Sequence, residues 1–76
     1  MGGLRSYRAY FLSASDRIRS VIAIQTMDDG SAAAEAEFLL MHSAYAAIEI
    51  WDRNRLVVRT ERAQQRLEAM RAMEAA

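Results

Sequence analysis

Two pairs of alternating segments, separated by one alanine-rich run, constrain the fold of this chain more than any other feature. Residues 4–12 (LRSYRAYFL) and 17–27 (RIRSVIAIQTM) alternate, and so do residues 45–51 (YAAIEIW) and 55–59 (RLVVR). A period of two with β-branched and aromatic residues is typical of β-strands. Residues 30–43 are rich in alanine and leucine, which favours a helix. The order predicts an α+β fold, in which two hairpins form one four-stranded, mainly antiparallel sheet with the helix on one face.

The first hairpin closes at the turn cluster SASD, residues 13–16. With this four-residue loop, we expect Leu12 to face Arg17 and Tyr7 to face Ile22. Opposed residues point to the same side of a sheet, and a slip by one residue would mix the apolar and polar faces. The register therefore predicts one apolar face made by Tyr7, Ala9, Phe11, Ile18, Ile22 and Ile24.

The second hairpin is expected to close through a three-residue loop, residues 52–54. Asn54 suits the left-handed backbone position of such a loop. This register predicts a buried face with Ile48, Ile50, Leu56 and Val58. The outward face then holds Glu49, Trp51, Arg55, Val57 and Arg59.

The predicted helix follows residues suited to cap it, namely Asp28, Asp29 and Ser31. Its helical wheel has two apolar arcs. The broader arc holds Ala32, Ala33, Ala36, Leu39 and Leu40, and the narrower arc holds Ala34, Phe38 and Met41. One sheet covers one stripe of a helix, so the narrower arc needs a second cover, either the C-terminal helix or another subunit.

The domain organisation predicted from these patterns is ββαββα. Residues 1–3 are expected to be a flexible leader, and residues 4–59 a single ββαββ domain. Residues 60–76 have helix-forming composition with a short apolar stripe that includes Leu67 and Met70, and we expect this helix to fray at its end.

The size of the chain favours self-association. A domain of this length buries only about 60% of the surface of its unfolded chain, so a disulfide, a metal or a partner usually assists it. No cysteine is present, and a single histidine, His42, disfavours an imidazole metal site. We therefore expect a homodimer, with a further protein partner possible. The predicted interface residues are Ala34, Phe38, Met41, Trp51, Leu67 and Met70. Packing of Trp51 within its own chain, under the C-terminal helix or against Arg55, stays an open alternative.

The sequence contains no pattern that indicates catalysis. No Ser/His/Asp arrangement, paired carboxylates or glycine-rich phosphate loop is present. We predict no catalytic, cofactor-binding or metal-binding residues, and hence a protein-interaction or structural domain that is not an enzyme. A small-ligand site in a groove between subunits is a further open alternative.

The charge balance disfavours nucleic acid as the partner. Ten arginines, with no lysine, balance ten acidic residues, whereas a nucleic-acid-binding domain is typically basic. The alternative function is a small regulator that binds nucleic acid through hairpin 51–62, with phosphate contacts from Arg53, Arg55, Arg59 and Arg62.

No apolar run reaches the length of a membrane helix and no secretory signal is visible, so we expect a cytoplasmic protein with no membrane association. Arginine in place of lysine, with abundant alanine, indicates a GC-rich bacterial genome.

Three segments carry a resemblance to a known group: YFLSASDRI, MDDGSAAAEAEFLL and AAIEIWDRNRLVVR. The chain resembles, over residues 7–59, a group of short bacterial proteins that share a domain of unknown function. That group has a hairpin, an alanine-rich helix and a closing hairpin with the pattern IE(V/I)W…RLV. Where this group would place a glycine-bearing turn, the chain has Arg53 and Asn54. The resemblance implies a compact bacterial fold and no particular chemistry.

Overall fold

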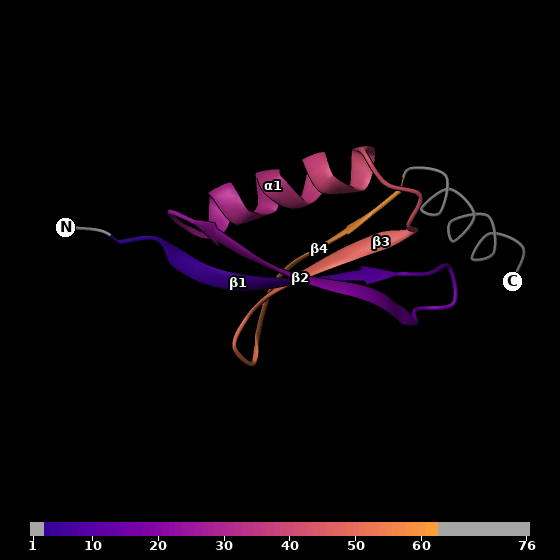
Figure 1. The fold of residues 1–76 in the computed structure, drawn as a ribbon, viewed down its shortest axis with the longest axis horizontal. Helices are drawn as coiled ribbons and strands as arrows, with labels where there is room; N and C mark the ends of the chain where they lie inside the picture. Colours follow the sequence, from indigo (N-terminus) through magenta and orange to yellow (C-terminus); the bar gives the residue numbers. More distant parts are fainter. Residues whose placement is uncertain (1–2, 63–76) are drawn as a thin grey trace, which may run out of the picture.

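The computed structural model describes residues 3–62, which form one open four-stranded sheet with a helix packed on one face (Figure 1). The elements in chain order are β1 (Arg5–Leu12), β2 (Ile18–Thr26), α1 (Asp29–Met41), β3 (Ala47–Asp52) and β4 (Arg55–Glu61). The predicted α+β fold is confirmed for this part of the chain. The predicted leader residues 1–2, most of the predicted C-terminal helix, and the predicted interface residues Leu67 and Met70 lie outside the described residues. Thr60 and Glu61, which were predicted to start that helix, belong to β4 instead.

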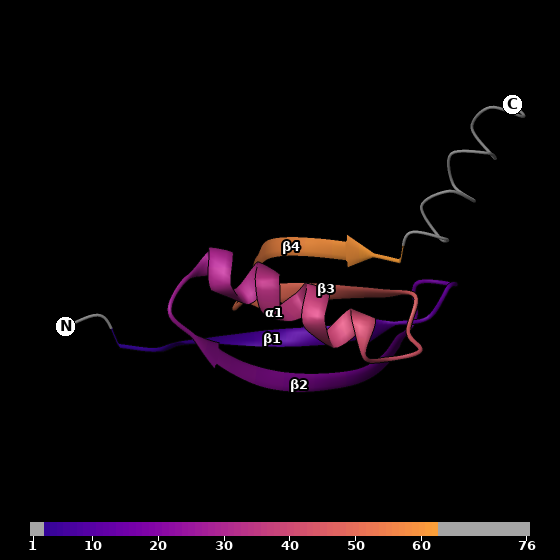
Figure 2. The same cartoon turned by 90° about the horizontal axis from the view of Figure 1, so that it is seen from above.

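The strand order is β2-β1-β3-β4, and every neighbouring pair is antiparallel. The two hairpins therefore meet at β1 and β3, and β2 and β4 form the edges. Because β2 and β3 both run antiparallel to β1, they are parallel to each other, and α1 connects them across the face of the sheet. Figure 2 shows α1 lying over the central strands. This arrangement covers one face of the sheet with a single helix.

The core lies between α1 and the two central strands. Its buried side chains are Tyr7, Ala9, Phe11, Ala32, Ala36, Leu40, Ile48 and Ile50. The helix contributes two alanines to this set, and their short side chains allow its backbone to approach the sheet closely. Aliphatic and aromatic side chains of β1 and β3 fill most of the rest, and the rings of Phe11 and Tyr45 lie 5.1 Å apart, centre to centre. The broader arc predicted for the helix faces this core through Ala32, Ala36 and Leu40.

The first hairpin has a different register from the prediction. Tyr7 faces Ile24 and Ala9 faces Ile22, a shift of two residues that leaves each of them on its predicted face. Two features cause the shift: the loop spans residues 13–17, and a bulge near the end of β1 leaves Arg19 without an opposed residue. Beyond the bulge, Ile18 faces Leu12 and so lies on the side of the sheet away from α1. The prediction that Ile18 belongs to the apolar face against the helix was wrong.

The second hairpin also has a different register from the prediction. Its turn has two residues, because Asp52 faces Arg55, and a bulge at Val57 then places Val58 opposite Ile50. The prediction that Leu56 is buried was wrong, since it faces Trp51 on the far side of the sheet and is 45% exposed. Val57, predicted to point outward, packs against the core. A bulge turns the strand locally, and the alternation of side chains fails at that point.

The turn of the second hairpin places an arginine in left-handed backbone geometry. Arg53 has φ of 58°, whereas Asn54, the predicted left-handed residue, does not have a positive φ. A side chain with a Cβ atom pays about 1–2 kcal/mol for this conformation.

The contrast between Ile50 and Leu56 tests the bulged register. Ile50→Ala should lower the free energy of unfolding by about 2–5 kcal/mol, because it opens a cavity in the core. Leu56→Ala should change it by less than about 1 kcal/mol, because Leu56 is exposed. Urea denaturation followed by circular dichroism measures both. Equal losses in the two variants would indicate the unbulged register, in which both residues are buried.

Arg53→Gly should stabilise the protein by about 0.5–1 kcal/mol. Glycine adopts a positive φ without the Cβ clash, and the greater conformational entropy of glycine in the unfolded chain offsets part of that gain. Asn54→Gly is the matched control. It should destabilise by about 0.5–1 kcal/mol, since only the entropic cost remains. Thermal unfolding of the two variants gives the comparison, and a less stable Arg53→Gly protein would contradict the turn geometry.

Candidate functional site

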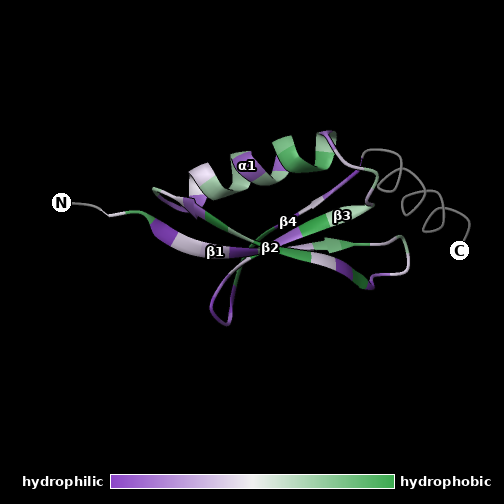
Figure 3. Ribbon diagram, in the orientation of Figure 1, coloured by the Kyte–Doolittle hydropathy of each residue, from purple (hydrophilic) through white to green (hydrophobic). Residues whose placement is uncertain are grey.

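Exposed apolar side chains are the most prominent surface feature of residues 3–62. Eight large ones are exposed, namely Leu4, Ile18, Val21, Ile22, Met27, Phe38, Met41 and Leu56. Six of them fall on three surfaces: the outer face of α1, the face of the sheet away from α1, and the edge strand β2. Leu4 and Met27 lie in the segments just before β1 and just after β2. Figure 3 shows apolar residues in the C-terminal half of α1 as well as on the strands. These three surfaces are the candidate sites.

The outer face of α1 carries the narrower arc predicted from the sequence. Phe38 is 56% exposed and Met41 is 73% exposed, and Ala34 is exposed beside them. The ring of Phe38 lies 4.4 Å from that of His42, centre to centre, at the end of the helix. No strand of the sheet reaches these residues, because the sheet packs on the opposite side of α1. The prediction that they form an interface stays a prediction.

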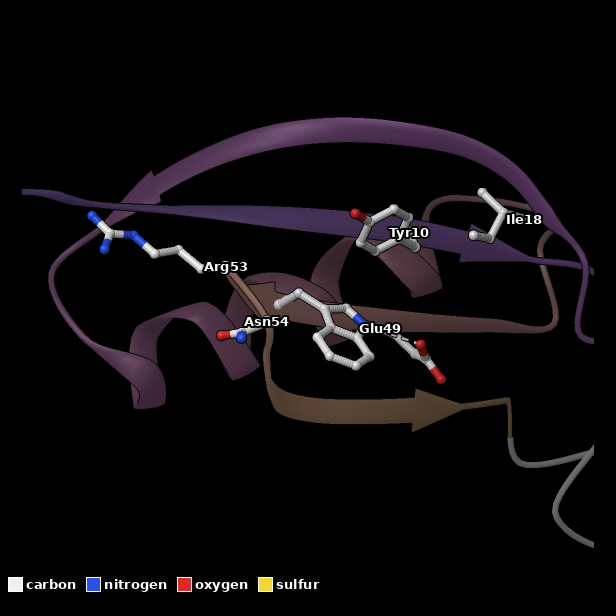
Figure 4. A pocket seen from close by; sticks show the side chains of 6 residues that line it. Tyr10, Ile18, Glu49, Arg53 and Asn54 are labelled. Atoms are coloured by element: carbon white, nitrogen blue, oxygen red, sulfur yellow. Dashed lines mark hydrogen bonds between the residues drawn. The ribbon is translucent and has the colours of Figure 1, made fainter.

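The far face of the sheet contains a hollow lined by Tyr10, Ile18, Glu49, Trp51, Arg53 and Asn54 (Figure 4). Trp51 Nε1 donates a 3.0 Å hydrogen bond to Glu49 Oε1, which fixes the indole ring across the strand. Trp51 lies on this face, as predicted, and is partly buried. Arg55, which was predicted as an alternative contact of Trp51, instead donates a hydrogen bond to Asp29 at the start of α1.

This hollow is small and mainly apolar. Its volume is about 300 Å³, at the lower end of the range for ligand pockets. Its walls are apolar, with polar groups from Glu49, Arg53 and Asn54 near the turn of the second hairpin. The Glu49 carboxylate accepts hydrogen bonds from Trp51 Nε1 and from the Arg59 guanidinium.

Arg55 connects the second hairpin to the start of α1. Its guanidinium donates to both carboxylate oxygens of Asp29, at 3.0 and 3.1 Å, and to Asp52 at 3.1 Å. The buried Tyr7 hydroxyl donates to the same Asp29 carboxylate at 2.9 Å. The prediction that Arg55 points to the outward face with Trp51 was wrong, because the two-residue turn places it beside Asp52 on the helix side.

These contacts shift the pKa values of the groups involved. The hydrogen bonds from Arg55 and Tyr7 lower the pKa of the Asp29 carboxyl. The bonds that Arg55 donates to Asp29 and then to Asp52 raise the pKa of Arg55. Burial, followed by the bond to Asp29, raises the pKa of the Tyr7 hydroxyl. Asp28, which caps α1, accepts a 2.8 Å bond from the backbone N–H of Ser31, and this bond lowers its pKa. All four groups therefore hold their usual charge states at neutral pH.

Arg59 and Arg62 also donate hydrogen bonds within the chain, Arg59 to carboxylates and Arg62 to backbone carbonyl oxygens. Arg59 donates to Asp16, Glu49 and Glu61, which ties β4 to the loop between β1 and β2, and its pKa is raised chiefly by Asp16. Arg62 donates to the carbonyl oxygens of Leu40, Ser43 and Tyr45 at the C-terminal end of α1. A cation there also favours the negative end of the helix dipole.

The four arginines of the predicted nucleic-acid surface are therefore not equivalent. Arg55 and Arg59 are ion-paired and Arg62 caps a helix end. Within residues 3–62, Arg53 is the one member of the four with no ion pair or side-chain hydrogen bond, and it is exposed at the turn. Sequence reasoning placed Glu49 and Arg59 on one outward face, which is correct. The partners Asp16 and Asp29 lie far away in sequence, so no local pattern could have identified them.

Two other kinds of site are absent from the described residues. Residues 3–62 contain no group of three or more histidine, cysteine, aspartate or glutamate side chains placed to hold a metal ion. In the same part of the chain, no helix has both the length and the apolar character that a membrane crossing requires.

Comparison with family models, with curated proteins and with solved structures gave no match in any of the three. The resemblance to a group of short bacterial proteins therefore stays a prediction.

Acid should destabilise the fold through Asp28 and Asp29. Their pKa values are lower in the folded protein than the ordinary value of 3.8, so they contribute stability above that pH. The contribution is lost as the pH falls through the folded values. The melting temperature should be flat from neutral pH to about pH 5 and should fall below about pH 4. Thermal unfolding by circular dichroism across this range measures it.

Asp29→Asn serves as the control for the acid prediction. The variant should melt at a lower temperature at neutral pH, and its melting temperature should decline less on acidification. An unchanged acid dependence in Asp29→Asn would show that other carboxyl groups control the response.

Proposed function

We propose that this protein is a small homodimeric interaction domain without a catalytic role. The observation that carries the proposal is the uncovered apolar surface of residues 3–62, with Phe38 and Met41 on the helix and Ile18, Val21 and Leu56 on the sheet. Burying one such side chain gains about 1.5–3 kcal/mol relative to leaving it in water. A partner that covers several of them therefore supplies free energy that is large compared with the stability of a small domain.

A second copy of the chain is the partner that this composition favours. Small domains often need an added constraint, and the absence of cysteine removes disulfides from the choices. The mixture of arginines and acids on the surface, with zero net charge, allows two copies to approach without net repulsion.

The arginine pairings weigh against the nucleic-acid alternative. Arg55 and Arg59 would have to leave Asp29 and Asp16 to reach phosphates, and Arg62 would have to leave the end of α1. Phosphate binding draws on cations that are free to displace counterions. Within hairpin 51–62, only Arg53 meets that requirement among the described residues.

Static light scattering over a concentration series tests the proposal. The mass at micromolar concentrations should be twice the 8.6 kDa of one chain and should fall on dilution. A single-chain mass throughout the series would contradict the proposal. As a second arm, duplex DNA at low salt should not bind. A salt-dependent complex that is lost on combining Arg53→Glu with Arg55→Glu would favour the nucleic-acid function instead.

A further inference from the structure

The free edge of β2 lacks the features that normally prevent strands from pairing. An edge strand presents unpaired N–H and C=O groups, and proteins guard it with charges, proline or bulges. The single bulge of β2 is at Arg19, near its start. The stretch that follows, residues 20–26 (SVIAIQT), pairs regularly with β1 and contains no charged residue and no proline. These seven residues form an open template for another strand.

The other edge of the sheet, β4, is guarded. Its strand carries Arg55, Arg59 and Glu61, and each of these takes part in an ion pair. Its bulge at Val57 lies in the middle of the strand rather than at its start. The two edges of one sheet thus differ in charge and regularity, and only β2 is suited to accept a neighbour.

The side chains of β2 are also uncovered on both sides of the sheet. Val21 faces Tyr10 on the far side and is 48% exposed, and Ile22 faces Ala9 on the helix side and is 37% exposed. A strand placed alongside would cover part of each, because neighbouring strands lie about 4.8 Å apart. Both backbone groups and apolar side chains would gain from that contact.

We propose that two copies of the chain pair antiparallel along β2, about a two-fold axis at Ala23, and join their sheets into one. This inference rests on the homodimer proposed above and places its interface at β2, so that Val21 and Ile22 are partly covered while Phe38 and Met41 on α1 stay outside it. The uncharged stretch 20–26 is centred on Ala23, so this register pairs it over its whole length. Ile22 then faces Ile24 of the partner subunit, and the helices of both copies lie on the same side of the joined sheet. A shift by one residue would place opposed side chains on different faces.

The charges that flank β2 specify a second copy as the occupant. Arg17 and Arg19 lie at its start, and Asp28 and Asp29 follow its end. In an antiparallel pair the start of one strand lies beside the end of the other, so Arg17 and Arg19 lie near Asp28 of the partner subunit, and the contact occurs twice. Within residues 3–62 neither Arg17 nor Arg19 has an ion pair, and Asp28 has none either, since its carboxylate accepts only the backbone N–H of Ser31. Asp29 is already paired with Arg55. Complementary charges of this kind set register and orientation.

Substitution at Ala23 tests the axis, because this residue opposes its own copy. Ala23 is exposed, so a change there should leave the subunit folded. Ala23→Lys and Ala23→Glu should each weaken the dimer at least about ten-fold, since like charges meet at the axis. An equimolar mixture of the two variants should restore the dimer. Ala23→Glu should disturb the folded subunit less than Ala23→Lys, because Arg8 lies opposite residue 23 on β1.

Cysteine cross-linking gives a second readout in a chain that has no cysteine of its own. Opposed residues of antiparallel strands have Cα atoms about 4.5–5.5 Å apart, within the range that a disulfide spans. Ala23→Cys should therefore cross-link the dimer under mild oxidation. Ala34→Cys, an exposed alanine on the outer face of α1, is the matched control and should remain uncrosslinked.

The outcomes separate this interface from self-association in general. Loss of the dimer in each charged variant, its recovery in the mixture, and cross-linking at residue 23 support pairing along β2. A wild-type dimer that both charged variants retain, or that cross-links at residue 34 alone, would overturn the β2 interface and leave the homodimer standing. A wild-type protein that is monomeric at all concentrations would overturn both.

Discussion

One helix on a four-stranded sheet can cover only one of its faces, and the rest of this structure follows from that limit. Within residues 3–62, α1 packs on β1 and β3 through Ala32, Ala36 and Leu40, and the close approach leaves a thin core. The opposite face of the sheet, the outer face of the helix and the edge β2 keep apolar side chains in contact with solvent. We propose that a second copy of the chain covers part of this exposed apolar surface.

The arginines of the second hairpin serve mainly to hold the periphery of this thin domain together. Arg55 joins the hairpin to the start of α1, Arg62 joins β4 to its end, and Arg59 reaches the loop of the first hairpin. Exposed ion pairs contribute little individually, but these three connect segments that are distant in sequence. Because these arginines already have intramolecular partners, the apolar surfaces remain the better candidates for recognition.

Sequence periodicity predicted the order of elements and, for most residues, the face of the sheet on which each lies. Tyr7, Ile48 and Ile50 are buried as expected because a register shift of two residues preserves alternation. Ile18 and Leu56 were assigned to the wrong face because each lies next to a bulge, which no local pattern revealed. The predicted hairpin placed Glu49 and Arg59 on one outward face, but its register set Glu49 opposite Val57, so their ion pair appears only with the bulged register. The pairing of Asp29 with Arg55 depends on the three-dimensional fold.

Amide hydrogen exchange of the wild-type protein, compared at low and high concentration, addresses the uncovered surface most directly. If two copies pair along β2, the amides of residues 20–26 that point away from β1 should exchange more slowly at high concentration, while those of the guarded edge β4 should not change. Exchange in β2 that is the same at both concentrations would show that its edge stays open to solvent, and would contradict the association of two chains through this strand.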